Sequence, residues 1–246
     1  MSHDDDRPVG HILTRREVLA SLGVAAAAAL VPPGVIRGAA RRRPSRCVVR
    51  PAQTEGPYFV DTRLDRSDIR SDPASGMVPE GTPLFLTFQV GRMDGATCAP
   101  LPGVLVDIWQ CDSLGIYSGV KDINNLFDTT GKQFLRGHQR TDANGQATFR
   151  TVFPGWYQGR TVHIHFKLRT GPGAGQGHEF TSQLYFDDKV GDELFSHAPY
   201  SVNTQPRTRN SGDGIFRRER GPELVMDVER DSKGFRGVFD VGMVLR

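Results

Sequence analysis

Tyr157, His163 and His165 lie within nine residues of one another and could together bind a metal ion. Residues 161–166 alternate polar and apolar side chains, which is typical of a β-strand. On such a strand His163 and His165 share one face at about 6.6 Å between Cα atoms, near enough for both imidazoles to reach one ion. Two surface histidines that bind no metal would give the same pattern, so the spacing alone does not establish a metal site.

Two tyrosines are further candidate metal ligands. Tyr157 follows a Pro-Gly turn signal, and Tyr117 follows the apolar run of residues 104–111. An ionised phenolate is a hard anionic oxygen donor that suits a hard trivalent cation such as ferric iron, whereas zinc more often takes Cys, His and carboxylate. Each tyrosine alone would also fit ordinary packing at the edge of a core.

Several short motifs follow one another between residues 54 and 216. They are Thr-Glu-Gly-Pro-Tyr-Phe (54–59), Leu-Pro-Gly (101–103), Val-Asp-Ile-Trp-Gln-Cys-Asp (106–112), Phe-Leu-Arg-Gly (134–137), Thr-Asp (141–142) followed by Gly145, the His-Ile-His segment, and Ser-Gln-Leu-Tyr-Phe (182–186). In this order and spacing the chain resembles the intradiol ring-cleavage dioxygenases, the family of protocatechuate 3,4-dioxygenase, catechol 1,2-dioxygenase and hydroxyquinol 1,2-dioxygenase.

The resemblance implies a set of site residues. It makes Tyr117, Tyr157, His163 and His165 the ligands of a non-haem Fe(3+). It places Arg160 beside the substrate-binding face of the iron, with Gln183 acting together with it, and Tyr58 in the lining of the substrate pocket. It also implies that Tyr157 leaves the iron when the diol binds. From the sequence alone, Arg160 also fits a surface cation after a turn.

The activity implied is cleavage of a catechol-type aromatic diol by O2 between the two hydroxyl-bearing carbons, giving a muconate-type diacid. The segment between Tyr157 and His163 is shorter than in well-known members, which leaves the choice among catechol, protocatechuate and hydroxyquinol open. One alternative is a secreted, non-catalytic β-sandwich binding module in which these residues are incidental. Another is a divalent-metal protein that uses the scattered His138, His178 and His197.

The N-terminus resembles an export signal. Residues 14–20, Thr-Arg-Arg-Glu-Val-Leu-Ala, resemble a twin-arginine motif, and the apolar stretch 18–31 is too short and too weakly hydrophobic for a membrane span. We expect a signal peptide over residues 1–40, cleaved at Ala40, and a mature domain over residues 41–246 in the periplasm or outside the cell. Stable membrane insertion is not expected, although an uncleaved N-terminal helix is an alternative.

Composition and cysteine count limit which other partners and cross-links the sequence predicts. A net charge of +3 over 246 residues is too mild to indicate a nucleic-acid partner, and no motif suggests one. Three cysteines allow at most one disulfide, and Cys47 and Cys98, both in turn-like segments, are the candidates for it. Cys111 lies in an apolar run and is expected to be a buried free thiol. A homo-oligomer is compatible with the resemblance, because members of the family commonly form oligomers.

Short strand signals predict the fold class. They cover residues 84–90, 103–110, 147–152, 161–167, 182–186 and 235–244, separated by Gly, Pro and Asn-Gly turns. An all-β fold, an antiparallel β-sandwich with long loops, is predicted, and the resemblance implies the same. Residues 142–145 predict a hairpin and residues 188–196 a helix. The long stretch 197–214 is expected to line the pocket or a subunit contact.

Overall fold

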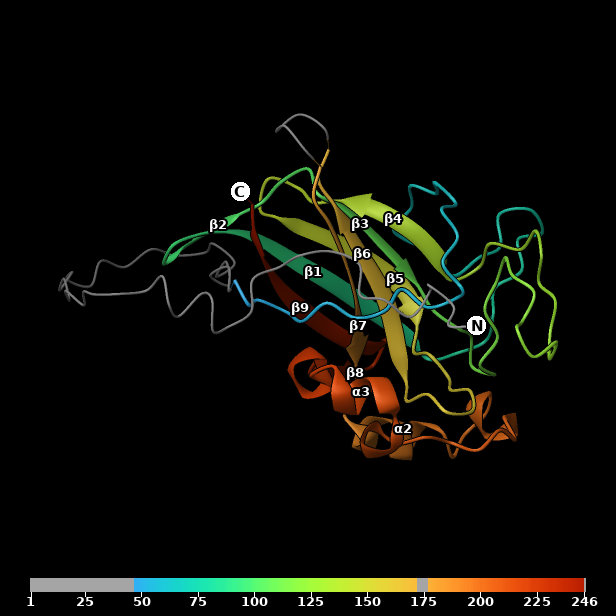
Figure 1. The fold of residues 1–246 in the computed structure, drawn as a ribbon. Helices are drawn as coiled ribbons and strands as arrows, with labels where there is room; N and C mark the ends of the chain where they lie inside the picture. The colour runs from blue at the N-terminus through green and yellow to red at the C-terminus, as the bar shows by residue number, and fades with distance from the viewer. Residues whose placement is uncertain (1–46, 172–176, 246) are drawn as a thin grey trace.

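The computed structural model describes residues 47–171 and 177–245 as a sandwich of two β-sheets (Figure 1). The expected signal peptide, residues 1–40, and its cleavage at Ala40 lie outside the described residues. Among the residues that are described, no helix is both long enough and apolar enough to cross a membrane.

Strand β1 is the centre of the five-stranded sheet. It has β9 on one side and β5 and β2 on the other, and β8 lies beyond β9. These strands are β1 (Pro83–Asp94), β2 (Thr97–Pro100), β5 (Gln146–Val152), β8 (Val228–Asp231) and β9 (Gly234–Val244).

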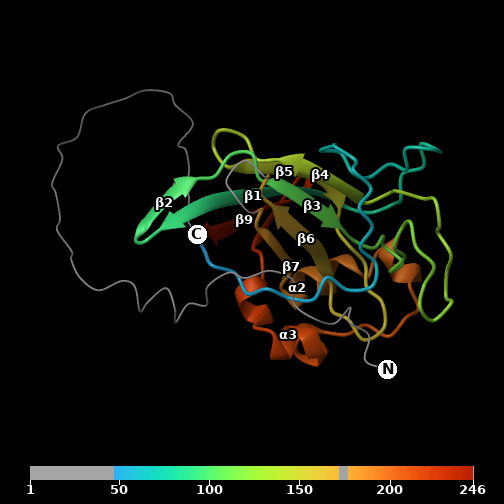
Figure 2. The same ribbon diagram turned by 45° about the horizontal axis from the view of Figure 1, so that its top comes forward.

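The four-stranded sheet has the order β4-β3-β6-β7, and a group of short helices lies at one end of the sandwich (Figures 1 and 2). The strands are β3 (Leu105–Trp109), β4 (Arg136–Arg140), β6 (His163–Arg169) and β7 (Glu179–Tyr185). The helices are α2 (Asp188–Leu194) and α3 (Gly214–Arg218), with 3₁₀ turns η3 (Tyr200–Val202), η4 (Asn210–Gly212) and η5 (Gly221–Leu224).

The predicted all-β sandwich is confirmed, and each of the predicted strands is present with shifted ends, as is helix α2. One strand pair departs from the predicted antiparallel arrangement, because β1 and β9 pair in parallel. The predicted hairpin at residues 142–145 was wrong. The turn forms, with Gly145 N donating to Asp142 O at 2.9 Å, but β4 pairs with β3 and β5 pairs with β1. Local turn chemistry does not decide which sheet the next strand joins, and here the turn carries the chain from one sheet to the other.

The core lies between the sheets and follows the period-two alternation of the strands. Ile164, Phe166 and Leu168 of β6 are buried in it, and the Phe166 ring lies 5.2 Å from the ring of Phe88 on β1. The opposite face of β6 is buried as well, since the segment preceding β1 crosses over it (Figure 1). On that face Lys167 Nζ contacts Glu55 at 2.5 Å. A strand covered on both faces can therefore carry a polar face that water does not reach.

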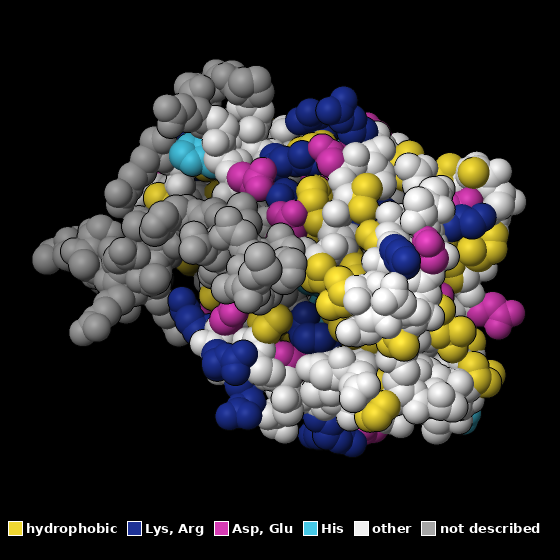
Figure 3. All heavy atoms as spheres, turned by 45° about the vertical axis from the view of Figure 1, so that its right-hand side comes forward, with side chains coloured by type: hydrophobic (Ala, Val, Ile, Leu, Met, Phe, Trp, Pro, Cys, Tyr) yellow, Lys and Arg dark blue, Asp and Glu magenta, His cyan; other side chains and the backbone are white. Residues whose placement is uncertain are grey.

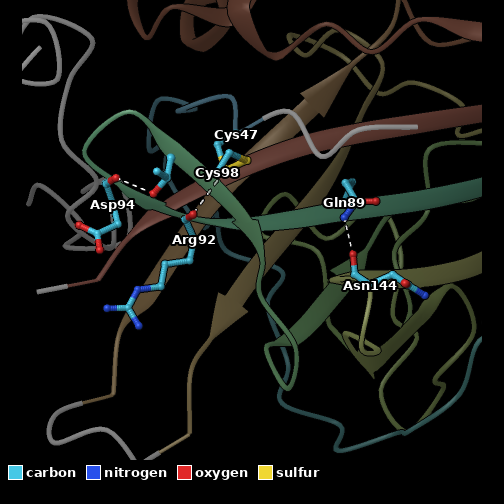
Figure 4. Close-up of a disulfide and its surroundings, with 7 residues drawn as sticks. Cys47, Gln89, Arg92, Asp94, Cys98 and Asn144 are labelled. Atoms are coloured by element: carbon cyan, nitrogen blue, oxygen red, sulfur yellow. Dashed lines mark hydrogen bonds between the residues drawn. A yellow bond between two sulfur atoms is a disulfide. The ribbon is translucent and has the colours of Figure 1, made fainter. Parts of the chain in front are cut away.

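The expected disulfide between Cys47 and Cys98 is present, with 5.7 Å between Cα atoms (Figure 4). It joins the first described residue to β2. In the same region the Gln89 side chain donates to Asn144 O at 2.7 Å and so fastens the 142–145 turn to β1 (Figure 4). Cys111 is a buried free thiol, as expected.

Candidate metal centre and substrate pocket

Strand β6 presents both histidines to the covered polar face. Its register pairs His165 with Trp109 of β3 and with Gln183 of β7, and pairs His163 with Tyr185. Both histidines are 2% exposed, and their Nε2 atoms lie 3.1 Å apart. The indole of Trp109 stacks on the His165 ring with 5.0 Å between centroids and 9° between planes. The two rings are thus held by a central strand and its neighbours rather than by a loop.

Two loops bring the tyrosines to the same point. The loop after β3 is tied together by the Asp112 carboxylate, whose Oδ1 accepts from the backbone N of Leu114 and of Ile116 at 2.9 Å each. Gly115 in this loop has φ +84°, and a Cβ there would lie 2.3 Å from a backbone oxygen, so a glycine is required. This tight loop delivers Tyr117, which is 0% exposed.

The segment carrying Tyr157 packs against that loop. Gly155 N donates to Asp112 O at 3.0 Å, and a Cβ on Gly155 would lie 2.4 Å from the backbone O of Ser113. The close approach of the two backbones places Tyr157 beside Tyr117, with ring centroids 5.8 Å apart. Tyr157 is partly exposed, unlike the other three candidate ligands.

Four donor atoms converge on one point. The hydroxyl oxygens of Tyr117 and Tyr157 each lie 3.3 Å from His163 Nε2. His163 Nδ1 donates to Thr161 O at 2.6 Å, so Nε2 carries the ring's only lone pair. One lone pair cannot satisfy two phenols and a second imidazole. A first-row metal ion holds N and O donors at about 2.0–2.2 Å, which puts neighbouring donors roughly 3 Å apart. The spacing therefore fits four ligands of one ion.

The protonation states also fit a cation. Burial, followed by the nearby charge of Arg160, lowers the pKa of His163 to about 3, and burial lowers the pKa of His165 well below its usual value. Both imidazoles are therefore neutral and able to ligate. Burial likewise raises the pKa of Tyr117 and of Tyr157, so their phenolates need a strong positive charge nearby. A hard trivalent ion such as Fe(3+) would supply it.

The alternative divalent-metal site has no support in residues 47–171 and 177–245. No group of three or more His, Cys, Asp or Glu side chains suited to a metal occurs in those ranges. His138 lies on β4, His178 just before β7 and His197 after α2.

Arg160 and Gln183 come together beside the tyrosines. Arg160 Nη2 donates to Gln183 Oε1 at 2.5 Å, and its Nε donates to Asp213 Oδ2 at 2.9 Å. Gln183 is held in turn, since its Nε2 donates to Thr54 O at 3.1 Å. Burial alone would lower the pKa of Arg160. The interactions with Tyr157 and Asp213 raise it by more, so the pKa of the guanidinium lies above its ordinary value. Arg160 is thus a permanently charged, oriented group and not a loose surface cation.

Asp213 is a site residue that sequence reasoning missed. It is 0% exposed, and its Oδ1 accepts from Ile215 N at 2.7 Å and from Phe216 N at 3.1 Å, which caps helix α3. An aspartate ahead of a short helical pattern is a detectable capping signal. Its second role, holding Arg160 from 53 residues away, leaves no local signal.

A pocket of about 350 Å³ opens next to Tyr157. Tyr58 lines it, as the resemblance implies, and its ring lies 4.8 Å from that of Tyr117. The Tyr58 hydroxyl donates to Asp122 Oδ1 at 2.5 Å. Gln205, from the stretch 197–214, also lines the pocket, which is one of the two roles expected for that stretch. Figure 3 views the side of the molecule on which these loops lie.

Comparison with known proteins finds relatives of one kind. The family model described as Dioxygenase matches residues 54–227. An intradiol ring-cleavage dioxygenase of Tetranychus urticae is 32% identical with a TM-score of 0.68, over 80% of this chain and 95% of that one. The dioxygenase domain of a dioxygenase carbohydrate-binding protein fusion from Streptomyces sp. SirexAA-E is 34% identical with a TM-score of 0.56, over 81% and 100%.

A curated relative covers less of the chain. Catechol 1,2-dioxygenase 1 of Acinetobacter lwoffii is 30% identical over an alignment of 142 positions, which covers 47% of this chain and 40% of that protein. The chain therefore spans less than half the length of this relative. The family model, in contrast, matches well over half of the chain, and its range begins with the Thr-Glu-Gly-Pro-Tyr-Phe motif and contains the four candidate ligands. On this match the chain belongs to the intradiol ring-cleavage dioxygenases.

Proposed function

We propose that this chain is a non-haem iron(III) dioxygenase that cleaves catechol-type aromatic diols between the two hydroxyl-bearing carbons with O2, giving muconate-type diacids. The observation that carries the proposal is the convergence of two phenol oxygens and one imidazole nitrogen within 3.3 Å of His163 Nε2, at the edge of a pocket. When bound, ferric iron would serve as a Lewis acid and electron acceptor that makes the diol reactive toward O2.

Tyr157 is the ligand that we expect the diol to displace. It lines the pocket and is partly exposed, whereas Tyr117 is fully buried. Its raised pKa makes the released phenolate a good acceptor for a proton of the incoming diol.

Arg160 would stabilise negative charge that develops on the ring during the reaction. A preorganised charge aimed at such a position is often a large contribution to catalysis. Gln183 and Asp213 hold the guanidinium from two sides, so both are positioning residues.

The test is a visible absorption spectrum of the iron-loaded mature chain, with and without catechol in the absence of air. We expect a tyrosinate-to-iron band that moves to longer wavelength when catechol is added. In Tyr157→Phe the catechol-dependent change should be slower or smaller, and Tyr117→Phe should lose the metal. A protein that stays colourless after addition of ferric iron would overturn the proposal and favour a non-catalytic β-sandwich binding module.

Export by the twin-arginine route is a further part of the proposal. It rests on the motif at residues 14–20, and the Cys47–Cys98 disulfide is compatible with it because disulfides persist in oxidising compartments. Fractionation of cells that express the chain, beside a variant with Arg15 and Arg16 changed to Lys, tests it. Wild-type protein that stays in the cytoplasm would contradict export, and light scattering would decide whether the chain forms a homo-oligomer.

A further inference from the structure

The mouth of the pocket beside Tyr157 exposes large apolar side chains. Leu114, Ile123 and Leu126 line it and are 36%, 68% and 71% exposed. In the part of the chain that the structure describes, only five other large hydrophobic side chains are exposed to a comparable degree. Figure 3 shows hydrophobic side chains at the surface on this side of the molecule. Apolar groups gathered around a pocket are typical of a binding surface.

The loop that carries two of these side chains has a defined shape. Asp122 N donates to Phe127 O at 3.0 Å, and Asn125 N donates to Asp122 O at 2.9 Å. The Asp122 Oδ2 accepts from the backbone N of Asn124 at 2.8 Å and of Leu126 at 3.1 Å. The carboxylate at the centre of the loop therefore supports the positions of Ile123 and Leu126.

The pocket lining contains no Lys, Arg or His among the residues the structure describes. Apart from tyrosines, its one ionisable side chain is Asp122. Burial opposes the charge on this carboxylate, but the hydrogen bonds from Tyr58 and from backbone N–H groups outweigh it and lower its pKa. Arg160 is not part of the lining, and its guanidinium is matched by Asp213 at 2.9 Å. An anionic substituent that extends into this pocket would thus meet a like charge and no side chain of opposite charge in its lining.

We propose, building on the function proposed above, that this pocket selects catechols with an uncharged apolar substituent, such as an alkyl or aryl group, over carboxylated diols. Its volume of about 350 Å³ leaves room beside a single ring. The substituent would lie against Leu114, Ile123 and Leu126. Each methylene buried there strengthens binding roughly fourfold.

The test is an air-free titration of the iron-loaded mature chain with catechol, 4-propylcatechol and protocatechuate, followed by the visible band and by calorimetry. We expect 4-propylcatechol to bind at least about tenfold more tightly than catechol, which corresponds to about three methylenes only partly buried. Protocatechuate should bind more weakly than catechol. Equal affinities for the three diols, or tighter binding of protocatechuate, would overturn the inference.

Variants of the rim connect the selectivity to these residues. Ile123→Ser and Leu126→Ser should each reduce the ratio of propylcatechol to catechol affinity at least threefold. Leu126→Arg should raise the affinity for protocatechuate. The matched control is Val238→Ser, which changes an exposed valine on β9 outside this pocket and should leave the ratio unchanged. A ratio that is insensitive to both rim serines would place the substituent elsewhere.

The result also separates this inference from the function on which it rests. A chain that binds iron but whose band does not respond to catechol itself would refute the proposed function. A chain that responds to catechol without preferring the propyl derivative would refute only the substrate class.

Discussion

Replacing Asp213 with asparagine should weaken the fold and misplace Arg160 together, because one buried carboxylate serves both. Its Oδ2 accepts from Arg160 Nε and from Thr161 N at 2.9 Å each. Its Oδ1 accepts from the first turn of α3, from Ile215 N at 2.7 Å and Phe216 N at 3.1 Å. Asparagine keeps the shape but turns one acceptor oxygen into a donor. Either the arginine or the helix then loses its partner.

The size of the effect follows from burial. Removing one partner of a buried ion pair costs about 3–5 kcal/mol of unfolding free energy. Because the Arg160 side chain keeps 15% exposure, water offsets part of the loss and we expect about 3 kcal/mol. This is a large share of the roughly 5–15 kcal/mol that a domain of this kind has, but it leaves the chain folded. Loss of an oriented charge at the reacting ring should also reduce kcat/KM roughly 100-fold.

Urea unfolding measures the first quantity, and oxygen uptake with catechol measures the second. The matched control is Asp192→Asn, since the Asp192 carboxylate pairs with Arg207 at 2.7 Å and Arg209 at 2.8 Å but is 41% exposed. Such an exposed pair is screened by water and contributes far less to the unfolding free energy than a buried pair. A loss below 1 kcal/mol for Asp213→Asn, or equal losses for the two variants, would refute the reasoning.

The same variant has a pH signature. Burial would raise the pKa of Asp213, but Arg160 and the N–H groups outweigh it and hold the pKa below its ordinary value of 3.8. A carboxylate with a depressed folded pKa stabilises the protein fully above its unfolded pKa and loses that effect as pH falls through the folded value. The stability gap between wild type and Asp213→Asn should therefore be constant above about pH 5 and shrink below about pH 4. A gap that widens on acidification would contradict this sign.

Three further predictions concern the ligands and their supports. Tyr117→Phe removes the oxygen of a fully buried candidate ligand and should abolish the expected colour and most bound iron, as metal analysis would measure. Gly115→Ala should lower both iron content and melting temperature, whereas Gly131→Ala, at a similar φ of +83° but in open space, should cost only about 1 kcal/mol. Reducing the bridge between Cys47 and Cys98, which are 51 residues apart, should lower the unfolding free energy by about 4 kcal/mol in urea titrations with and without reductant.

Strand β6 could be predicted from sequence because its own residues alternate. Strands β2, β4 and β8 could not. Strand β4 reads Arg-Gly-His-Gln-Arg, without an apolar face, and β2 is exposed throughout. Each forms because a neighbour offers backbone hydrogen bonds, β3 for β4 and β1 for β2. Strand formation by pairing leaves little trace in a single sequence.

The candidate ligands could be predicted from the sequence, because tyrosine and histidine are themselves metal-binding residue types. The residues that hold the site together are ordinary aspartates, and what distinguishes them is a distant partner. Asp213 contacts Arg160 from 53 residues away, and Asp122 contacts Tyr58 from 64 residues away. Local periodicity and turn residues do not predict such contacts, because these contacts form only when the sheets have assembled.

The division of the four candidate ligands between strand and loop bears on which of them the proposed reaction would displace. His163 and His165 are fixed by a central strand, and Tyr117 by a loop whose Gly115 admits no side chain. Tyr157 differs from them in that its side chain is partly exposed and lines the pocket, while hydrogen bonds from Gln158 N to Gln205 Oε1 at 3.2 Å and from Gly159 N to Thr208 Oγ1 at 3.1 Å hold the turn after it. A rotation of the Tyr157 side chain toward the pocket would therefore leave the backbone in place, whereas the other three candidate ligands are fully buried against the sheet or the tight loop. On this argument the proposed displacement of Tyr157, and not of another candidate ligand, follows from where the fold places the four side chains.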